Sequence, residues 1–189
     1  MSGDERVRLF VALELPSFVR DALVLWRPSS GRGLRLIDPA ALHVTLCFLG
    51  WRVEREVQPI LQACARVAWI PPASLVVDDA LWLPPRRPRV LAVRLRDDGG
   101  RLARGQAELS EALQAGGWYT PEVRPFLAHV TVARVAREVR RAPATAPAAP
   151  PELSFEAARV TLYRSRLSSA GARYEALGTV VLGSARGLE

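Results

Sequence analysis

Two nearly identical stretches, Leu42–Leu46 and Ala128–Val132, constrain the fold of this chain more than any other feature of its sequence. They read LHVTL and AHVTV, and runs of Val, Leu and Thr like these are typical of β-strands. Side chains alternate between the two faces of a strand, so the His and the Thr of each copy share one face. Each stretch therefore predicts a strand with one apolar face and one face that carries an imidazole beside a hydroxyl. Two such strands facing each other would form a pocket with two imidazoles and two hydroxyls.

The rest of the chain places these two strands in similar surroundings. Each follows a shorter apolar strand and a helix, and the two histidines stand 86 positions apart. This order predicts an α+β fold in which two related lobes form a single domain over residues 1–189. Segment 140–151 contains only small residues and proline after its two arginines, so we expect a flexible connector there. The predicted strands lie at 8–15, 34–37, 42–49 (ended by Gly50), 74–83, 88–96, 126–135, 155–162 and 174–182. The predicted helices lie at 17–26, 54–68 and 102–114. Pro59 falls inside the second helix and marks either a kink or a late start of that helix.

Charge and cysteine content narrow the class of protein. The net charge is +7 and all 26 basic residues are arginine, which indicates either an anionic partner or a solvated surface in a chain with an arginine bias. Two cysteines, Cys47 and Cys64, are too few for a disulfide framework, and we expect Cys47 to be a buried thiol. No apolar run reaches the roughly 18 residues of a membrane span, and the charged N-terminus lacks a signal-peptide pattern. We expect a cytoplasmic protein without a membrane partner.

The two histidines are the only ones in the chain, and their repeated context bears on the chemistry. One His in an apolar strand is usually a packed core residue, but a doubled His-Val-Thr motif favours a functional site. A zinc site would need further ligands; Cys47 follows His43 by four positions, yet nothing similar accompanies His129, so we expect no metal. Neither a nucleophile elbow nor a phosphate-binding glycine loop is present. Two imidazoles that titrate near neutral pH can act as a pair, one taking a proton and the other giving one. The threonine hydroxyls can donate hydrogen bonds to the non-bridging oxygens of a phosphodiester.

Four sequence blocks in this order resemble the two-histidine phosphoesterase superfamily. Within it, the chain is similar to the LigT-like RNA 2',3'-cyclic phosphodiesterases, historically called 2'-5' RNA ligases. Any single His-x-Thr is weak evidence, but the ordered set covers nearly the whole chain. The blocks are Arg8–Leu13, Leu42–Gly50, Arg124–Arg134 and Leu162–Ser165, the last followed by Tyr174 and Glu175.

The resemblance implies a bilobal, pseudo-symmetric α+β fold with antiparallel sheets lining a central cleft and helices outside. It also implies hydrolysis of an RNA-terminal 2',3'-cyclic phosphate to a 2'-phosphate without metal or cofactor, with 2'-5' RNA ligation as the reverse reaction. His43 then corresponds to the proton donor and His129 to the proton acceptor. Thr45, Thr131 and Arg134 correspond to phosphate-binding residues.

Two aspects of this assignment stay open at the level of sequence. Arg134 lies five positions after His129, and in an ideal strand this odd spacing would turn its side chain to the face opposite the histidine. We therefore expect the strand to end or twist at Arg134. The competing interpretation is that Arg134 forms a salt bridge elsewhere. Phe48 and Tyr163 are either base-stacking residues or core residues. The expected partner is an RNA 3' end or a nucleotide with a 2',3'-cyclic phosphate, bound by a monomer. The alternatives are a cyclic phosphodiesterase for a small non-RNA nucleotide and a non-catalytic nucleotide-binding module.

Overall fold

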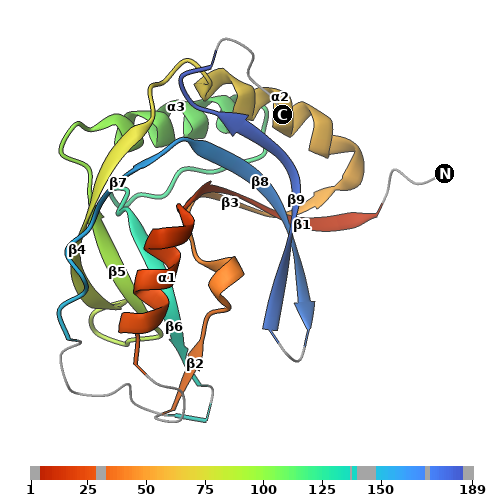
Figure 1. Ribbon diagram of the computed structural model, residues 1–189. Helices are drawn as coiled ribbons and strands as arrows, with labels where there is room; N and C mark the ends of the chain where they lie inside the picture. The colour runs from red at the N-terminus through yellow and green to blue at the C-terminus, as the bar shows by residue number, and fades with distance from the viewer. Residues whose placement is uncertain (1–4, 29–32, 137, 140–147, 169–170, 185–189) are drawn as a thin grey trace.

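A curved antiparallel sheet carries the fold, and helices pack against it (Figure 1). The computed structural model describes residues 5–28, 33–136, 138–139, 148–168 and 171–184. Most of the predicted connector, residues 140–147, therefore lies outside the described residues. The helices are α1 (Ser17–Trp26), α2 (Val57–Cys64) and α3 (Arg101–Ala115). The strands are β1 (Arg6–Glu14), β2 (Leu34–Leu36), β3 (His43–Val53), β4 (Ala73–Leu83), β5 (Val90–Arg96), β6 (His129–Val135), β7 (Ser154–Ala157), β8 (Arg159–Ser168) and β9 (Gly171–Val181).

The sheet consists of two halves that meet at the two motif strands. Its strands follow the order β7-β4-β5-β6-β3-β1-β8-β9, with β2 paired to β6. The boundary lies between β6 and β3, which are joined in the described part of the chain by the one pair Val44 and Val130. This arrangement confirms the predicted α+β fold with two related halves, and it joins their sheets into one. A shared hydrophobic core includes Leu9 and Leu162 of one half and Leu91 and Leu109 of the other. The single domain over residues 1–189 stays a prediction.

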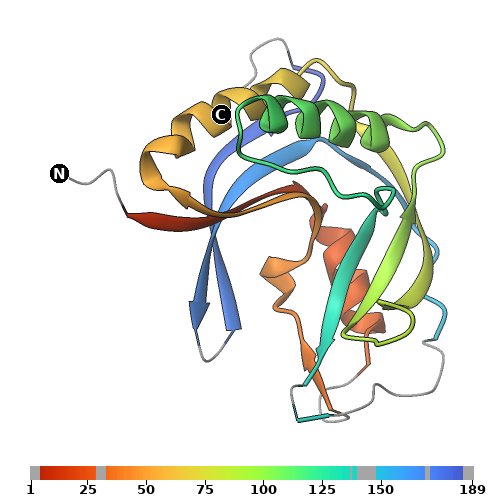
Figure 2. The same cartoon turned by 180° about the vertical axis from the view of Figure 1, so that it is seen from behind.

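Two of the helices lie together over the arch of the sheet (Figure 2). The α2 helix packs against β8 and β9, while α3 packs against β3 and β4, and the two helices contact each other. Each follows the predicted helical periodicity, because its buried residues recur at helical spacing. Pro59 is the third residue of α2, where a backbone N–H has no partner within the helix. The proline therefore marks a late start, and residues 54–56 and 65–67 form 3₁₀ turns instead of α-helix.

Two strand predictions are wrong because of pairing between distant parts of the chain, and a third strand starts later than predicted. The first motif strand does not end at Gly50 but continues to Val53. Leu9 pairs with Gly50 and Phe10 with Phe48, so one extra residue forms a β-bulge. Gly50 has a φ of 71°, in the left-handed region that glycine adopts without steric cost. The bulge keeps the strand in the sheet.

The run predicted as one strand over 155–162 is two strands with different partners. It divides at Ala158 into β7, which pairs with β4, and β8, which pairs with β1. The chain thus moves from one half of the sheet to the other at this residue. The second motif strand begins at His129 instead of residue 126.

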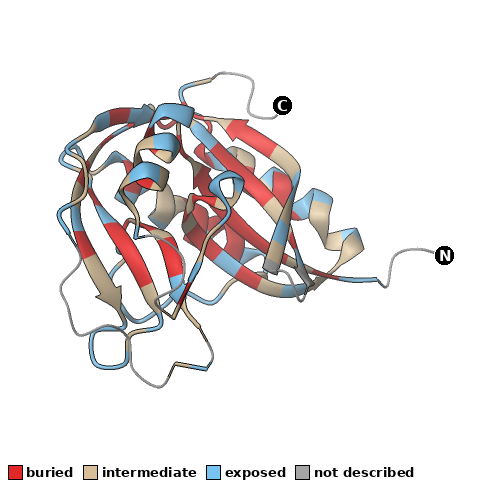
Figure 3. Cartoon of the chain, turned by 60° about the horizontal axis from the view of Figure 1, so that its bottom comes forward, coloured by how far each residue is buried: buried red, intermediate tan, exposed pale blue. Residues whose placement is uncertain are grey.

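Burial alternates along β7 and the first part of β4, whereas β1 is buried at five successive residues. Figure 3 shows buried positions in bands along the strands, interrupted by half-buried and exposed ones. Among the described residues, no helix is long and apolar enough to cross a membrane.

Candidate active site

The two motif strands have the same burial pattern over their first six residues. In both β3 and β6 a half-buried His is followed by a buried Val, a half-buried Thr, two buried apolar residues and one exposed residue. Two buried residues in succession break the alternation of a regular strand. Both strands therefore contain a local irregularity at the same place, and in both it comes directly after the threonine.

The irregularity is a β-bulge in each strand. In β3 the partners shift between Val11, opposite Cys47, and Ala12, opposite Thr45. In β6 they shift between Leu91, opposite Ala133, and Ala92, opposite Thr131. One extra residue in a strand returns the side chains beyond it to the face they would otherwise leave.

The residue five positions after each histidine consequently shares a face with the His and the Thr. It is Phe48 in β3 and Arg134 in β6. The sequence predicts that the strand ends or twists at Arg134. The structure has a bulge just before this residue, which increases the local twist, and β6 ends one residue later at Val135. The bulge brings Arg134 to the pocket face.

A cavity of about 120 Å³ lies where these faces meet. The predicted site residues His43, Thr45, His129, Thr131 and Arg134 all line it, together with Phe48. Three polar residues that the sequence analysis did not single out as site residues also line it: Arg8, Ser165 and Tyr174. All three lie in blocks of the family resemblance, which was the one available signal. Only the pairing of β1 with β3 and β8, and of β8 with β9, brings them beside the histidines.

Both histidines are held by the same backbone interaction. The Nδ1 atom of His43 lies 2.7 Å from the carbonyl oxygen of Ala41, and that of His129 lies 2.8 Å from the carbonyl oxygen of Leu127. A carbonyl oxygen only accepts hydrogen bonds, so each Nδ1 carries a hydrogen. Nε2 is then the atom of each ring that can give or take a proton. The Nε2 atom of His43 lies 3.1 Å from the Thr45 hydroxyl.

The surroundings of His43 disfavour its charged form. The pKa of His43 is lowered to about 4, mainly by burial; the carbonyl of Ala41 raises it, while the charge of Arg134 and the electrostatic interaction with His129 contribute to the lowering. His43 is therefore neutral at pH 7 when the cavity holds no anion. A negatively charged group between these residues would offset the repulsion from Arg134 and favour the imidazolium.

Aromatic rings contact His43 and, within the described residues, none contacts His129. The Phe10 ring centroid is 5.0 Å from that of His43, and the Tyr174 ring meets it edge-on at 5.4 Å. Tyr163 stacks on Phe10 at 5.3 Å. These rings limit the orientations that the His43 side chain can adopt.

The two predicted base-stacking residues lie in different environments. Phe48 is 46% exposed, and the guanidinium carbon of Arg8 lies 4.6 Å from its ring centroid. Tyr163 lines a second cavity of about 80 Å³ on another side of His43, where its hydroxyl donates to Glu14 Oε1 at 3.2 Å. Burial, with the charge of Glu14, raises the pKa of Tyr163 to about 12. Base stacking stays a prediction for both residues, and only Phe48 lines the main cavity.

Neither cysteine is placed to join the histidines in a metal site. The bulge after Thr45 turns Cys47 into the core, and Cys64 is also buried. Burial raises the pKa of each thiol to about 12, so both stay protonated. In the part of the chain that the structure describes, three or more His, Cys, Asp or Glu side chains nowhere gather where they could hold a metal ion.

Known proteins resemble this chain over nearly its whole length. The family model described as LigT-like phosphoesterase matches residues 13–92. The RNA 2',3'-cyclic phosphodiesterase of Escherichia coli is 31% identical over 188 residues, covering 92% of this chain and 95% of that protein. The protein of the same name from Thermus thermophilus is 34% identical over 197 residues, covering 97% and 94%. A crystal structure of E. coli LigT complexed with 3'-AMP has a TM-score of 0.81 at 27% identity, covering 95% of this chain and 100% of that one.

Proposed function

The chain belongs to the LigT-like phosphoesterase family, and we propose that it is an RNA 2',3'-cyclic phosphodiesterase, a hydrolase that opens the terminal cyclic phosphate of RNA. One observation carries the proposal. Two His-x-Thr strands with the same bulge line one cavity, and in both histidines Nδ1 is committed to a backbone carbonyl, which leaves Nε2 for proton transfer. The two relatives from E. coli and T. thermophilus, which carry this activity in their names, align over more than nine-tenths of the chain.

The two histidines divide the proton transfers of the hydrolysis. His129 Nε2 takes a proton from water as the water oxygen forms a bond to phosphorus, and His43 Nε2 gives a proton to the ribose oxygen whose bond to phosphorus breaks. After one turnover His129 carries one more proton and His43 one fewer, and exchange with solvent restores both. The family resemblance selects the 3' oxygen as the leaving group, so the product carries a 2'-phosphate. With the 5'-hydroxyl of a second RNA in place of water as the group that attacks phosphorus, the same steps join two RNA ends through a 2'-5' linkage.

The remaining polar residues of the cavity bind the phosphate. The hydroxyls of Thr45 and Thr131 donate to its non-bridging oxygens, and the guanidinium of Arg134 balances its charge. The Thr45 hydroxyl lies beside the Nε2 atom of His43. An oxygen held by Thr45 is therefore held close to the proton that His43 gives away.

The substrate itself prepares His43 as an acid. The low pKa of His43 in the empty cavity reflects burial first and the positive charge of Arg134 in addition. A bound phosphodiester anion lies beside His43 and Arg134 and offsets this repulsion, so His43 takes up its proton together with the substrate. This order of events makes the proton donor available only when a phosphate is present.

The direct test is to incubate the purified protein with an RNA oligonucleotide that ends in a 2',3'-cyclic phosphate. We expect a single product with a terminal 2'-phosphate, identified by chromatography or phosphorus NMR. The reaction should proceed in excess EDTA, because the described cavity residues supply no cluster of metal ligands. A product with mainly 3'-phosphate would overturn the orientation, and activity only on small cyclic nucleotides would favour a non-RNA substrate.

We propose further that one chain acts as a monomer in the cytoplasm. All residues assigned to the reaction come from one chain and line one cavity, so no second copy is needed to complete it. Light scattering of the pure protein tests the monomer, since a stable dimer would contradict it.

A further inference from the structure

We propose that the enzyme has a second nucleotide subsite next to the cavity, in which Trp51 stacks on the base 5' to the cyclic-phosphate nucleotide while Arg6 and Arg8 contact the RNA backbone. The proposal rests on the proposed function, because it concerns the RNA that enters the same cavity. It predicts that the enzyme distinguishes an oligonucleotide from a mononucleotide.

The strand register places Trp51 on the face of the sheet that lines the cavity. Phe10 pairs with Phe48, and Arg8 pairs with Trp51. Directly opposite residues of neighbouring strands share a face, and Arg8 and Phe10, two apart on β1, share one as well. Arg8, Phe10 and Phe48 line the cavity. Trp51 therefore continues the same wall one step beyond the cavity, and the bulge between Phe48 and Trp51 keeps both rings on this face.

The side chains along this wall have the chemistry of a single-strand binding surface. Phe48 is 46% exposed and Trp51 is 53% exposed. Arg8 lies over the Phe48 ring and donates to the Ser165 hydroxyl at 3.3 Å. Arg6 is exposed and lies two residues before Arg8 on the same face of β1. Exposed aromatic rings with arginines beside them bind single-stranded nucleic acid by base stacking and phosphate contacts.

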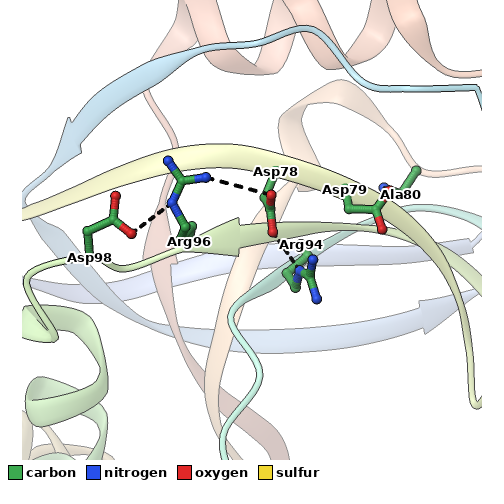
Figure 4. Close-up of polar contacts among 6 residues, drawn as sticks. All are labelled: Asp78, Asp79, Ala80, Arg94, Arg96 and Asp98. Carbon is green, nitrogen blue, oxygen red and sulfur yellow. Dashed lines mark hydrogen bonds and ion pairs between the residues drawn. The ribbon is translucent and has the colours of Figure 1, made fainter.

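The other side of the cavity is less suited to an RNA strand. There Arg94 lies opposite His129 on β5, and its Nε atom is 2.7 Å from Asp78 (Figure 4). Arg96 pairs with the same aspartate at 3.7 Å and with Asp98 at 2.7 Å. The positive charges are thus compensated by carboxylates. None of the large apolar side chains exposed in the described residues lies on β4 or β5.

The direction of the strand follows from the chemistry of its end. The cyclic phosphate occupies the 3'-terminal ribose, so the rest of the RNA leaves this ribose through its 5' oxygen. With the cyclic phosphate between the histidines and the terminal base on Phe48, the 5' phosphate passes Arg8 and the next base reaches Trp51. A mononucleotide ends before Trp51 and does not use it.

The test compares two substrates in three variants. Cytidine 2',3'-cyclic phosphate ends at the cavity, whereas a trinucleotide with the same terminus reaches Trp51. We expect Trp51→Thr, which keeps a strand-forming residue, to raise KM for the trinucleotide about 5- to 100-fold and leave its kcat and the mononucleotide kinetics unchanged. Trp51→Phe should retain most of the trinucleotide affinity. Trp69→Thr is the matched control, because Trp69 is 59% exposed and lies outside the sheet.

A binding measurement makes the result independent of turnover. Fluorescence anisotropy of a labelled trinucleotide ending in a 2'-phosphate should show weaker binding to Trp51→Thr than to Trp69→Thr. For Arg6→Gln we expect the plot of the logarithm of the association constant against the logarithm of the salt concentration to become less steep by about 0.7. This is the change for one lost phosphate contact on a single strand. Equal affinity of both tryptophan variants, or an equal loss on both substrates, would overturn the subsite. Absence of hydrolysis with either substrate would instead contradict the proposed function, and anisotropy would still decide the subsite.

Discussion

At the scale of single residues, His43 and His129 share a backbone partner but not an environment. Both donate from Nδ1 to a carbonyl two positions earlier. Phe10 and Tyr174 contact the His43 ring, and burial lowers its pKa. The difference suits two groups with opposite tasks, because in the proposed reaction His43 gives a proton to the leaving oxygen while His129 takes a different proton from water on the opposite side of phosphorus.

Because the two tasks differ, neither histidine can replace the other. We expect His43→Ala and His129→Ala each to lower turnover of a cyclic phosphate by about two to four orders of magnitude, as is typical of general acid–base groups. Affinity for the 2'-phosphate product should change far less. Single-turnover kinetics and product titration measure the two effects. Near wild-type turnover in either variant would contradict paired catalysis.

The low pKa of His43 also makes the stability of the protein depend on pH. Between its ordinary value of 6.5 and about 4, the unfolded chain binds a proton at this residue that the folded chain does not. The free energy of unfolding should therefore decrease as the pH falls through this range, by about 3 kcal/mol at most. Below pH 4 both states are protonated and this contribution stops changing.

Urea denaturation at pH 7 and pH 4.5 measures this loss. In His43→Gln, which cannot titrate, the part of the loss that belongs to His43 should disappear. Saturation with 2'-AMP should raise the pKa of His43 in an NMR titration, because the bound anion favours the imidazolium. A His43 resonance with an unshifted pKa in both states would contradict the substrate-dependent acid.

At the scale of elements, the bulges decide which residues the motif strands present. The sequence after each threonine continues with two apolar residues, and an ideal strand would turn the first of them into the core and the second to the pocket. The bulge turns both into the core and returns the next residue to the pocket face. The two strands then differ at this position, since β3 presents Phe48 and β6 presents Arg134. One half supplies an aromatic ring and the other supplies a charge.

The position of Arg134 on this face predicts a specific loss. Arg134→Ala should lower kcat/KM for a cyclic phosphate about 10- to 100-fold, the effect of losing one hydrogen bond to a charged group. The pKa of His43 should rise in the same variant, because Arg134 is one of the charges that lower it. Steady-state kinetics and the NMR titration of His43 test both effects. Arg94→Ala is a suitable control, since Arg94 is paired with Asp78.

At the scale of the whole molecule, two half-sheets share a core and meet at one residue pair. Val44 and Val130 are fully buried where the halves join. The motif strands touch there and share few other contacts, which leaves room for the cavity beside them. The core runs continuously through both halves, with the packed helices α2 and α3 on top.

A continuous core predicts one cooperative unfolding transition for residues 1–189. Val130→Ala should lower the free energy of unfolding by about 1–3 kcal/mol, because it opens a cavity at the boundary between the halves. The transition should shift without splitting. Circular dichroism and tryptophan fluorescence should report the same midpoint, since tryptophans lie in both halves. Two separate midpoints would contradict the single domain.

The sequence alone determined the features that depend on neighbouring residues. Alternation placed each His beside its Thr on one face, and helical spacing located two of the three helices, because both patterns repeat within a few residues. The residues that flank the first helix, with Pro28 after it, located that helix. The family resemblance added Arg134 and the reaction. These predictions concern which side chains a segment presents, and they need no knowledge of its partners.

Only the tertiary structure decided what depends on pairing between distant strands. The bulge that turns Arg134 to the cavity is defined by a register shift against β5, and the one that carries β3 past Gly50 is defined against β1. The division at Ala158 reflects two partners in opposite halves, and Arg8, Ser165 and Tyr174 reach the cavity through pairing alone. Hydrogen-bond register is a property of two strands together, so neither strand's sequence contains it.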